Sequence, residues 1–159
     1  MRRQNLAVVG LALAGFGAVA FGITQEALTV APMYDGSITT GWGERLNHEE
    51  RLLRQVSALG AIGAVGALWR RYLAVLPVVT GGIVLFYPLR AMLHWTERPG
   101  LYTEVPTHDG GVTKVVLGAE PFLLLAGGLL LVSAGVLGWR WQKDHDETDG
   151  SAPGHSSTM

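Results

Sequence analysis

Two ionisable residues interrupt long apolar stretches of this chain, and they are the residues best placed to do chemistry. Arg90 interrupts the stretch 72–95, and Glu120 interrupts the stretch 115–139. A charge at the centre of a membrane helix costs about 2.5–3.5 kcal/mol even on the milder scales, so such a residue is a candidate functional site. If the two stretches cross a membrane in opposite directions, both charges lie roughly 7 Å below its outer surface. At that depth they could form an ion pair that joins the two helices.

Two other interpretations of these charges remain open. Each side chain could extend to the nearby interface while its aliphatic stem stays in the apolar region. Alternatively, the two could belong to a proton or ion pathway, which normally needs further polar residues at mid-depth, where the sequence places Thr80 and Ser133. Pro121 adds a further alternative, because proline favours the first position of a helix and would leave Glu120 at the membrane surface.

Three histidines lie close in sequence to carboxylates on what would be the outer side. They are His48, His94 and His108, beside Glu49, Glu97 and Asp109. Histidine and carboxylate side chains can bind a metal, but this spacing matches no known ligand pattern. The absence of cysteine removes thiolate ligands and cysteine nucleophiles. We therefore expect surface histidines, no metal site, no cofactor and no enzymatic activity.

The elements that position these residues are four apolar stretches. They cover residues 6–23, 52–69, 72–95 and 115–139. A helix of about 20 apolar residues crosses a bilayer core of about 30 Å. Of the 159 residues, 48% are hydrophobic and only 16% are charged, against about 25% charged in soluble domains. The sequence thus predicts an all-α membrane protein, in which residues 1–143 form a four-helix transmembrane bundle.

The distribution of basic residues predicts the orientation, because cytoplasmic flanks collect Lys and Arg. Short flanks on one side hold Arg2, Arg3, Arg70, Arg71, Arg140 and Lys143, whereas longer segments on the other side hold Arg45, Arg51, Arg54, Arg98 and Lys114. We expect a multi-pass protein of the cell membrane with both termini in the cytoplasm, and a disordered tail over 144–159. Alternatively, the first apolar run and Ala18–Ala20 fit a cleaved signal peptide, which would leave three spans.

Small residues at regular spacing predict where helices approach closely. Gly10, Ala14, Ala18 and Gly22 recur every four residues along the first stretch. We interpret this stripe as a face that packs inside the bundle, with docking of a partner subunit as the alternative. Further small residues are Ser57, Gly60, Ala64 and Ala67 in the second stretch, and Gly128, Gly135 and Gly138 in the fourth.

The two outer connections carry hairpin signals. Residues 28–30 and 38–40 flank a turn signal at 34–37, and residues 101–105 and 112–116 flank a second one at 108–111. Asp-Gly and Gly-Gly between β-branched runs favour tight hairpins. We expect two β-hairpins that join into a small sheet on the outer face of the bundle.

The composition includes ten arginines against two lysines, many glycines and alanines, and an acidic tail. In this composition the chain resembles small four-helix membrane proteins of halophilic archaea. Its layout also resembles claudin-type proteins, but their paired cysteines and tryptophan motif are absent, so no residue role follows.

We expect a scaffold or accessory subunit of a membrane complex. Its expected partners are the lipid bilayer and either another membrane protein or a second copy, without nucleic acid. The alternative is a small transporter or channel using Arg90 and Glu120.

Overall fold

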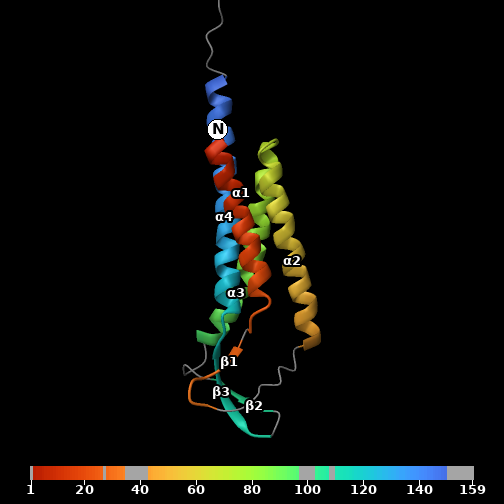
Figure 1. Ribbon diagram of the computed structural model, residues 1–159, viewed down its shortest axis with the longest axis vertical. Coiled ribbons are helices and arrows are strands. Elements are labelled where there is room, and N and C mark those ends of the chain that lie inside the picture. Colours follow the sequence, from red (N-terminus) through yellow and green to blue (C-terminus); the bar gives the residue numbers. More distant parts are fainter. Residues whose placement is uncertain (1, 27, 35–42, 97–102, 108–109, 150–159) are drawn as a thin grey trace, which may run out of the picture.

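The structure, a computed structural model, describes residues 2–26, 28–34, 43–96, 103–107 and 110–149. Four long helices run down, up, down and up in the view of Figure 1, beside one another. They are α1 (Arg2–Gly22), α2 (Gly43–Gly66), α3 (Val75–Thr96) and α4 (Glu120–Asp149). Three short strands lie beyond one end of the bundle, which we call the sheet end. At the opposite end, the turn end, residues 67–70 and the 3-10 helix η1 (Arg71–Ala74) connect α2 to α3.

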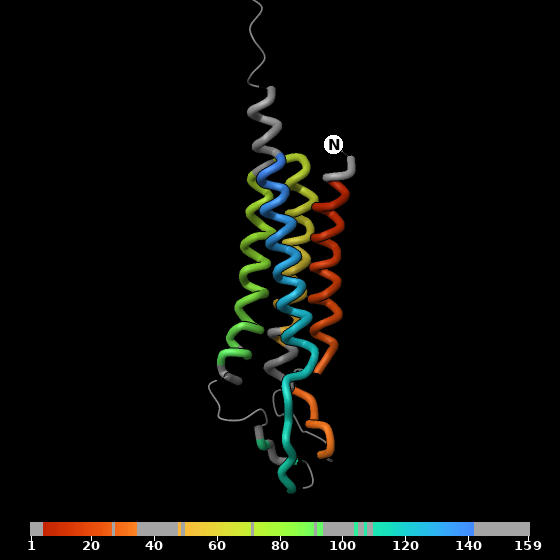
Figure 2. Tube along the Cα trace, turned by 90° about the vertical axis from the view of Figure 1, so that its left-hand side faces the viewer, coloured from red at the N-terminus to blue at the C-terminus, as the bar shows by residue number. Residues whose placement is uncertain are grey.

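The helices form a ring in which α4 lies between α1 and α3 (Figures 1 and 2). The fourth side of the ring is closed by α2, which contacts both α1 and α3. Each helix therefore packs mainly against two neighbours, and α2 lies diagonally opposite α4. This is the antiparallel arrangement of an up-and-down four-helix bundle.

The first and third predicted stretches agree closely with α1 and α3. Pro77 is the third residue of α3, in the first turn, where no backbone donor is needed. Pro88 lies inside the same helix and is fully buried. The helix continues past it to Thr96, so Pro88 does not end α3.

The fourth predicted stretch begins too early. Residues 115–117 belong to a strand, and α4 begins at Glu120 with Pro121 as its second residue. The run Val115–Val116 is β-branched, which favours a strand. Proline is favoured in the first turn of a helix, so the start of α4 next to Pro121 agrees with the alternative that Pro121 offered in the sequence. At the other end α4 continues to Asp149, so residues 144–149 of the predicted disordered tail are helical. The remaining tail residues, 150–159, lie outside the described part.

The second predicted stretch, 52–69, also needs correction, because α2 covers Gly43–Gly66. Within the described residues, three helices are long and apolar enough to cross a membrane, over Asn5–Gly22, Tyr72–Arg90 and Glu120–Trp141. The charged residues Glu49, Glu50, Arg51 and Arg54 occupy the first half of α2. Its uncharged part, 55–66, is only about 18 Å long.

A three-stranded antiparallel sheet has the order β1 (Leu28–Val30), β3 (Val112–Leu117), β2 (Thr103–Pro106). The predicted second hairpin is confirmed, since β2 and β3 pair from Thr103↔Val115 to Pro106↔Val112. Its turn places Gly110 at φ 79°, which glycine adopts without strain. The first connection contributes β1, which pairs with β3 and so joins the two connections in one sheet. Its predicted partner strand, 38–40, and turn residues 35–37 lie outside the described residues.

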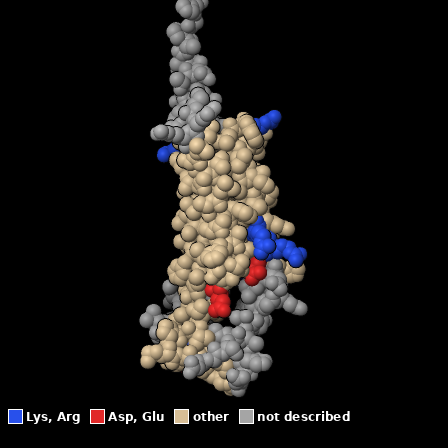
Figure 3. Space-filling model, viewed as in Figure 1, with Lys and Arg blue, Asp and Glu red and all other residues tan. Residues whose placement is uncertain are grey.

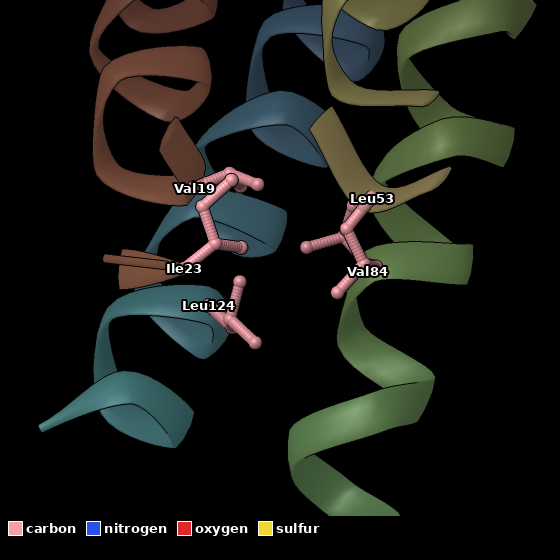
Figure 4. Close-up of a cluster of buried hydrophobic side chains, with 5 residues drawn as sticks. All are labelled: Val19, Ile23, Leu53, Val84 and Leu124. Carbon is pink, nitrogen blue, oxygen red and sulfur yellow. The ribbon is translucent and has the colours of Figure 1, made fainter. Parts of the chain in front are cut away.

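Two apolar clusters fill the interior of the bundle. The cluster nearer the sheet end contains Val19, Ile23, Leu53, Val84 and Leu124, so all four helices contribute (Figure 4). The cluster nearer the turn end contains Val8, Ala12, Ala64 and Ala134. The sheet-end cluster consists of Val, Ile and Leu, whereas the turn-end cluster is mostly alanine, whose small side chain allows the helices to lie close together.

Candidate functional site

The apolar cluster in Figure 4 marks a common level on all four helices, from which the charged residues can be placed. Arg54 directly follows Leu53 at this level. On α3, Arg90 lies six residues beyond Val84, or about 9 Å nearer the sheet end. On α4, Glu120 lies about 6 Å beyond this level on the same side. These charges therefore share one end of the bundle.

The predicted partners Arg90 and Glu120 lie at similar levels on neighbouring helices. Arg90 is exposed, and Glu120 is half-buried in the first turn of α4. A carboxylate at the start of a helix is favourable on its own because it faces the positive end of the helix dipole. The exposure of Arg90 agrees better with extension toward an interface, and an ion pair between the two stays a prediction.

The described interior of the bundle holds two buried polar side chains, Ser57 and Thr80. The Ser57 hydroxyl donates to the Arg54 carbonyl at 3.0 Å, and the Thr80 hydroxyl donates to the Leu76 carbonyl at 2.9 Å. Both hydrogen bonds stay within one helix. Ser133, the other polar residue predicted at mid-depth, is exposed on α4. The described part therefore shows no chain of polar groups along the bundle axis.

The histidines are not brought together in the described part. His48 is exposed on α2, the side chain of His94 is not described, and residue 108 lies outside the described ranges. Among the residues that the structure describes, no group of three histidines or carboxylates is close enough to hold a metal ion.

The predicted small-residue stripe on α1 does not follow one packed face. Gly10 and Ala14 are exposed, Ala18 is half-buried and Gly22 is buried. A Cβ added to Gly10 would meet nothing within 4 Å, whereas one on Gly22 would lie 3.0 Å from Leu123 Cβ. Residues four apart are offset by about 40° around a helix, so the stripe turns by about 120° over its length. It therefore leaves the packed face before it reaches Gly10.

The contact between α1 and α4 instead centres on Gly15 and Gly127. A Cβ on Gly15 would lie 2.9 Å from the Gly127 carbonyl oxygen, and a Cβ on Gly127 would lie 2.8 Å from the Gly15 carbonyl oxygen. Because both obstacles are backbone atoms, no side-chain rotation could relieve the overlap. These two positions require glycine if the helices keep this separation.

The contact between α3 and α4 repeats this arrangement with Gly81 and Gly128. A Cβ on Gly81 would lie 2.8 Å from the Gly128 carbonyl oxygen, and the reverse distance is 3.0 Å. Adjacent residues point about 100° apart on a helix. The Gly127–Gly128 doublet therefore lets α4 approach α1 with one residue and α3 with the next.

Two contacts of α2 with α3 also depend on glycine. A Cβ on Gly60 would overlap the Thr80 hydroxyl oxygen, and one on Gly63 would lie 2.5 Å from Leu76 Cβ. The sequence predicted packing at Gly60 and Gly128, but the spacing of small residues did not indicate Gly15, Gly63, Gly81 or Gly127. The doublet at 127–128 was an available signal, although the similar doublet Gly81–Gly82 packs through its first member alone.

Many large apolar side chains are exposed on the outside of the bundle. Leu6 is 70% exposed, Ile62 67% and Phe86 62%, on three different helices. On the face shown in Figure 3, an uncharged band separates the basic side chains at the turn end from a group of charged side chains that begins about half-way down and continues toward the sheet end. The bundle thus exposes many large apolar side chains, although its interior also contains buried residues such as Leu53, Leu124 and Leu131.

The chain matches no family model, no curated protein and no solved structure.

Proposed function

We propose that this chain is an integral protein of the cell membrane, crossed by all four helices, that serves as a scaffold or accessory subunit of a membrane complex. The observation that carries the proposal is the exposure of many large apolar side chains on the outside of the bundle. Leaving one Leu, Ile or Phe side chain in water instead of burying it forgoes about 1.5–3 kcal/mol. In lipid this cost disappears, and glycine contacts provide the close packing that holds membrane helices together.

The position of α2 fits this proposal despite its polar first half. From Gln55 to Trp69 the chain is uncharged, which gives about 22 Å if the axial rise stays helical. Trp69 is 80% exposed at the turn end, as expected for an interfacial tryptophan. Arg54 is exposed at the other limit and has a stem long enough to carry its charge toward the headgroups. A short span of this kind is accommodated by local thinning of the bilayer.

We place the turn end in the cytoplasm. The turn-end segments 1–3, 67–74 and 138–143 contain six basic residues and no acidic residue. All nine acidic residues before Asp144 fall within 26–50 or 97–120. Since positive charge collects on cytoplasmic flanks, this asymmetry supports cytoplasmic termini and an external sheet.

A scaffold role is favoured over transport because the buried hydroxyls of Ser57 and Thr80 are bonded within their own helices. The sheet and the outward face of α1 are the surfaces left for a partner. Purification in mild detergent tests this role. A discrete second protein at fixed stoichiometry is the expected result, whereas a homo-oligomer that conducts ions in vesicles would contradict it.

The absence of cysteine allows a direct test of membrane topology. Single variants Glu104→Cys in β2, Ile62→Cys in α2 and Arg140→Cys in α4 are labelled in intact cells with a membrane-impermeant maleimide. We expect Glu104→Cys to be labelled without permeabilisation and Arg140→Cys only after permeabilisation. Ile62→Cys should be labelled only after the protein is denatured. Labelling of Ile62→Cys in intact cells would contradict the membrane span of α2.

A further inference from the structure

We propose that the turn end binds the phosphate headgroups of anionic phospholipids in the cytoplasmic leaflet. The binding groups are the exposed guanidinium groups of Arg70 and Arg140, supported by Tyr72. This proposal rests on the proposed membrane insertion, since it needs the turn end to lie at the headgroup level.

The geometry begins with Gly138, at which the turn ends of the helices converge. A Cβ on Gly138 would lie 3.7 Å from Ala67 Cβ, 3.8 Å from Val8 Cγ1 and 3.9 Å from Ala74 Cβ. Arg140 follows this point by two residues on α4. Arg70 follows Ala67 by three residues, and Arg71 precedes Ala74 by three. Three arginines thus lie within about one helical turn of a single junction.

Arg70 is held in a position suited to an interfacial anion. Its Nη1 donates a hydrogen bond to the Tyr72 hydroxyl at 3.0 Å, and its guanidinium carbon lies 6.0 Å from the centroid of the Tyr72 ring. Both side chains are exposed. A guanidinium has five N–H donors in a fixed fork that matches phosphate oxygens, so several remain available after the bond to Tyr72. The Tyr72 hydroxyl keeps its own proton to donate.

Aromatic side chains place these arginines at the expected depth. Trp69 and Tyr72 are strongly exposed beside Arg70, and Trp139 is exposed beside Arg140. Tryptophan and tyrosine favour the headgroup region, where one end of the ring is apolar and the other is hydrated. Each arginine therefore has an aromatic neighbour that would hold it close to lipid phosphates.

The charge balance distinguishes this end from the sheet end. Asp144, the first acidic residue after Arg140, lies about 6 Å farther along the axis of α4. Asp149 lies about 13 Å from Arg140 in the same direction. Beyond Arg140, α4 projects away from the bundle (Figure 1), so the helix positions from Asp144 on lie farther from the headgroup plane. At the sheet end, by contrast, Glu50 directly precedes Arg51. We therefore expect a preference for anionic lipid at the turn end alone.

The test compares spin-labelled phosphatidylglycerol with spin-labelled phosphatidylcholine around the full chain in lipid nanodiscs. The measured quantity is the relative association constant of motionally restricted lipid. We expect the chain to prefer phosphatidylglycerol, and Arg70→Gln with Arg140→Gln to reduce that preference by up to about fivefold per arginine. Arg70→Lys with Arg140→Lys should retain most of it.

The sheet end supplies the matched control, Arg51→Gln with Arg54→Gln, which removes the same charge and should leave the preference intact. Equal losses in both double variants, or no preference in the unaltered chain, would overturn the proposal. So would loss of the preference when inorganic phosphate replaces chloride at constant ionic strength, because that result assigns the site to free phosphate. Circular dichroism confirms that each variant is folded. Failure to enter nanodiscs would refute the membrane insertion itself, which separates the two proposals.

Discussion

Packed and open glycines occur on the same helices of this protein. Gly15 on α1 and Gly81 on α3 each face a backbone carbonyl of α4 at less than 3 Å from an added Cβ. Gly17 and Gly82, two residues and one residue farther along, have nothing within 4 Å. The difference shows that glycine content alone does not locate a helix contact. What matters is the direction in which each glycine points relative to its neighbours.

The largest effect is expected when a packed glycine of α4 receives a large side chain. In Gly127→Leu, the new Cβ would lie 2.8 Å from the Gly15 carbonyl oxygen and 2.6 Å from Val19 Cγ2, so α1 must move away. We expect a loss of about 3 kcal/mol or more in the free energy of unfolding. Unfolding by dodecyl sulfate in mixed micelles measures it. The control Gly17→Leu, on an open position, should change stability little, and an equal loss in both variants would contradict the comparison.

A smaller effect is expected where the obstacle is a side chain that can be removed. Gly60→Ala places a methyl group on the Thr80 hydroxyl and should destabilise the bundle by about 1–3 kcal/mol. In Gly60→Ala with Thr80→Ala the hydroxyl is gone, so part of the loss should be recovered. A double-mutant cycle with the same unfolding assay gives the coupling energy between the two residues. Additive losses would show that the two helices do not meet at these residues.

The charges at the sheet end should matter less than the glycines. Because Arg90 is exposed, Arg90→Gln should change stability by less than about 1 kcal/mol. Glu120→Gln should cost about 0.3–1 kcal/mol through the dipole of α4. The coupling between them should be near zero in a double-mutant cycle. If either single variant loses much of its free energy of unfolding and the double variant Arg90→Glu with Glu120→Arg regains it, the two residues form the ion pair that the sequence suggests.

The smallest effect on stability is expected on the open face of α1. Gly10→Ala with Gly17→Ala fills free space and improves helix propensity, so the change should be neutral or stabilising by up to about 1 kcal/mol for each residue. Thermal unfolding in detergent measures the change. A clear destabilisation would show that another part of the protein, or a second copy, covers this face.

The sequence predicted those features that depend on local pattern. Apolar length located α1 and α3, and Gly110 at a positive φ closes a hairpin that the turn residues indicated. Burial direction was harder to predict, because it depends on how each helix is rotated. A four-residue spacing such as Gly10–Ala14 turns gradually around the helix, so it cannot by itself identify a packed face.

Two further failures concern the limits of elements, and both come from tertiary context. The apolar composition predicts Val115 as the start of a membrane helix, but pairing with Val30 and Thr103 makes it part of a strand. Residues 144–149 are too polar to pack in a core, yet they continue α4 to Asp149. In neither segment did the apolar or polar composition alone determine the secondary structure.

The most direct test of the account compares two adjacent residues of α3, Gly81→Ala and Gly82→Ala, in lipid bilayers. Composition, depth and helix propensity are nearly the same at both positions, and only the direction of the added methyl group differs. We predict a loss of about 1–3 kcal/mol in the free energy of unfolding for Gly81→Ala, and no loss for Gly82→Ala. Equal stability of the two variants, or a greater loss for Gly82→Ala, would contradict the inward packing of small residues on which the account depends.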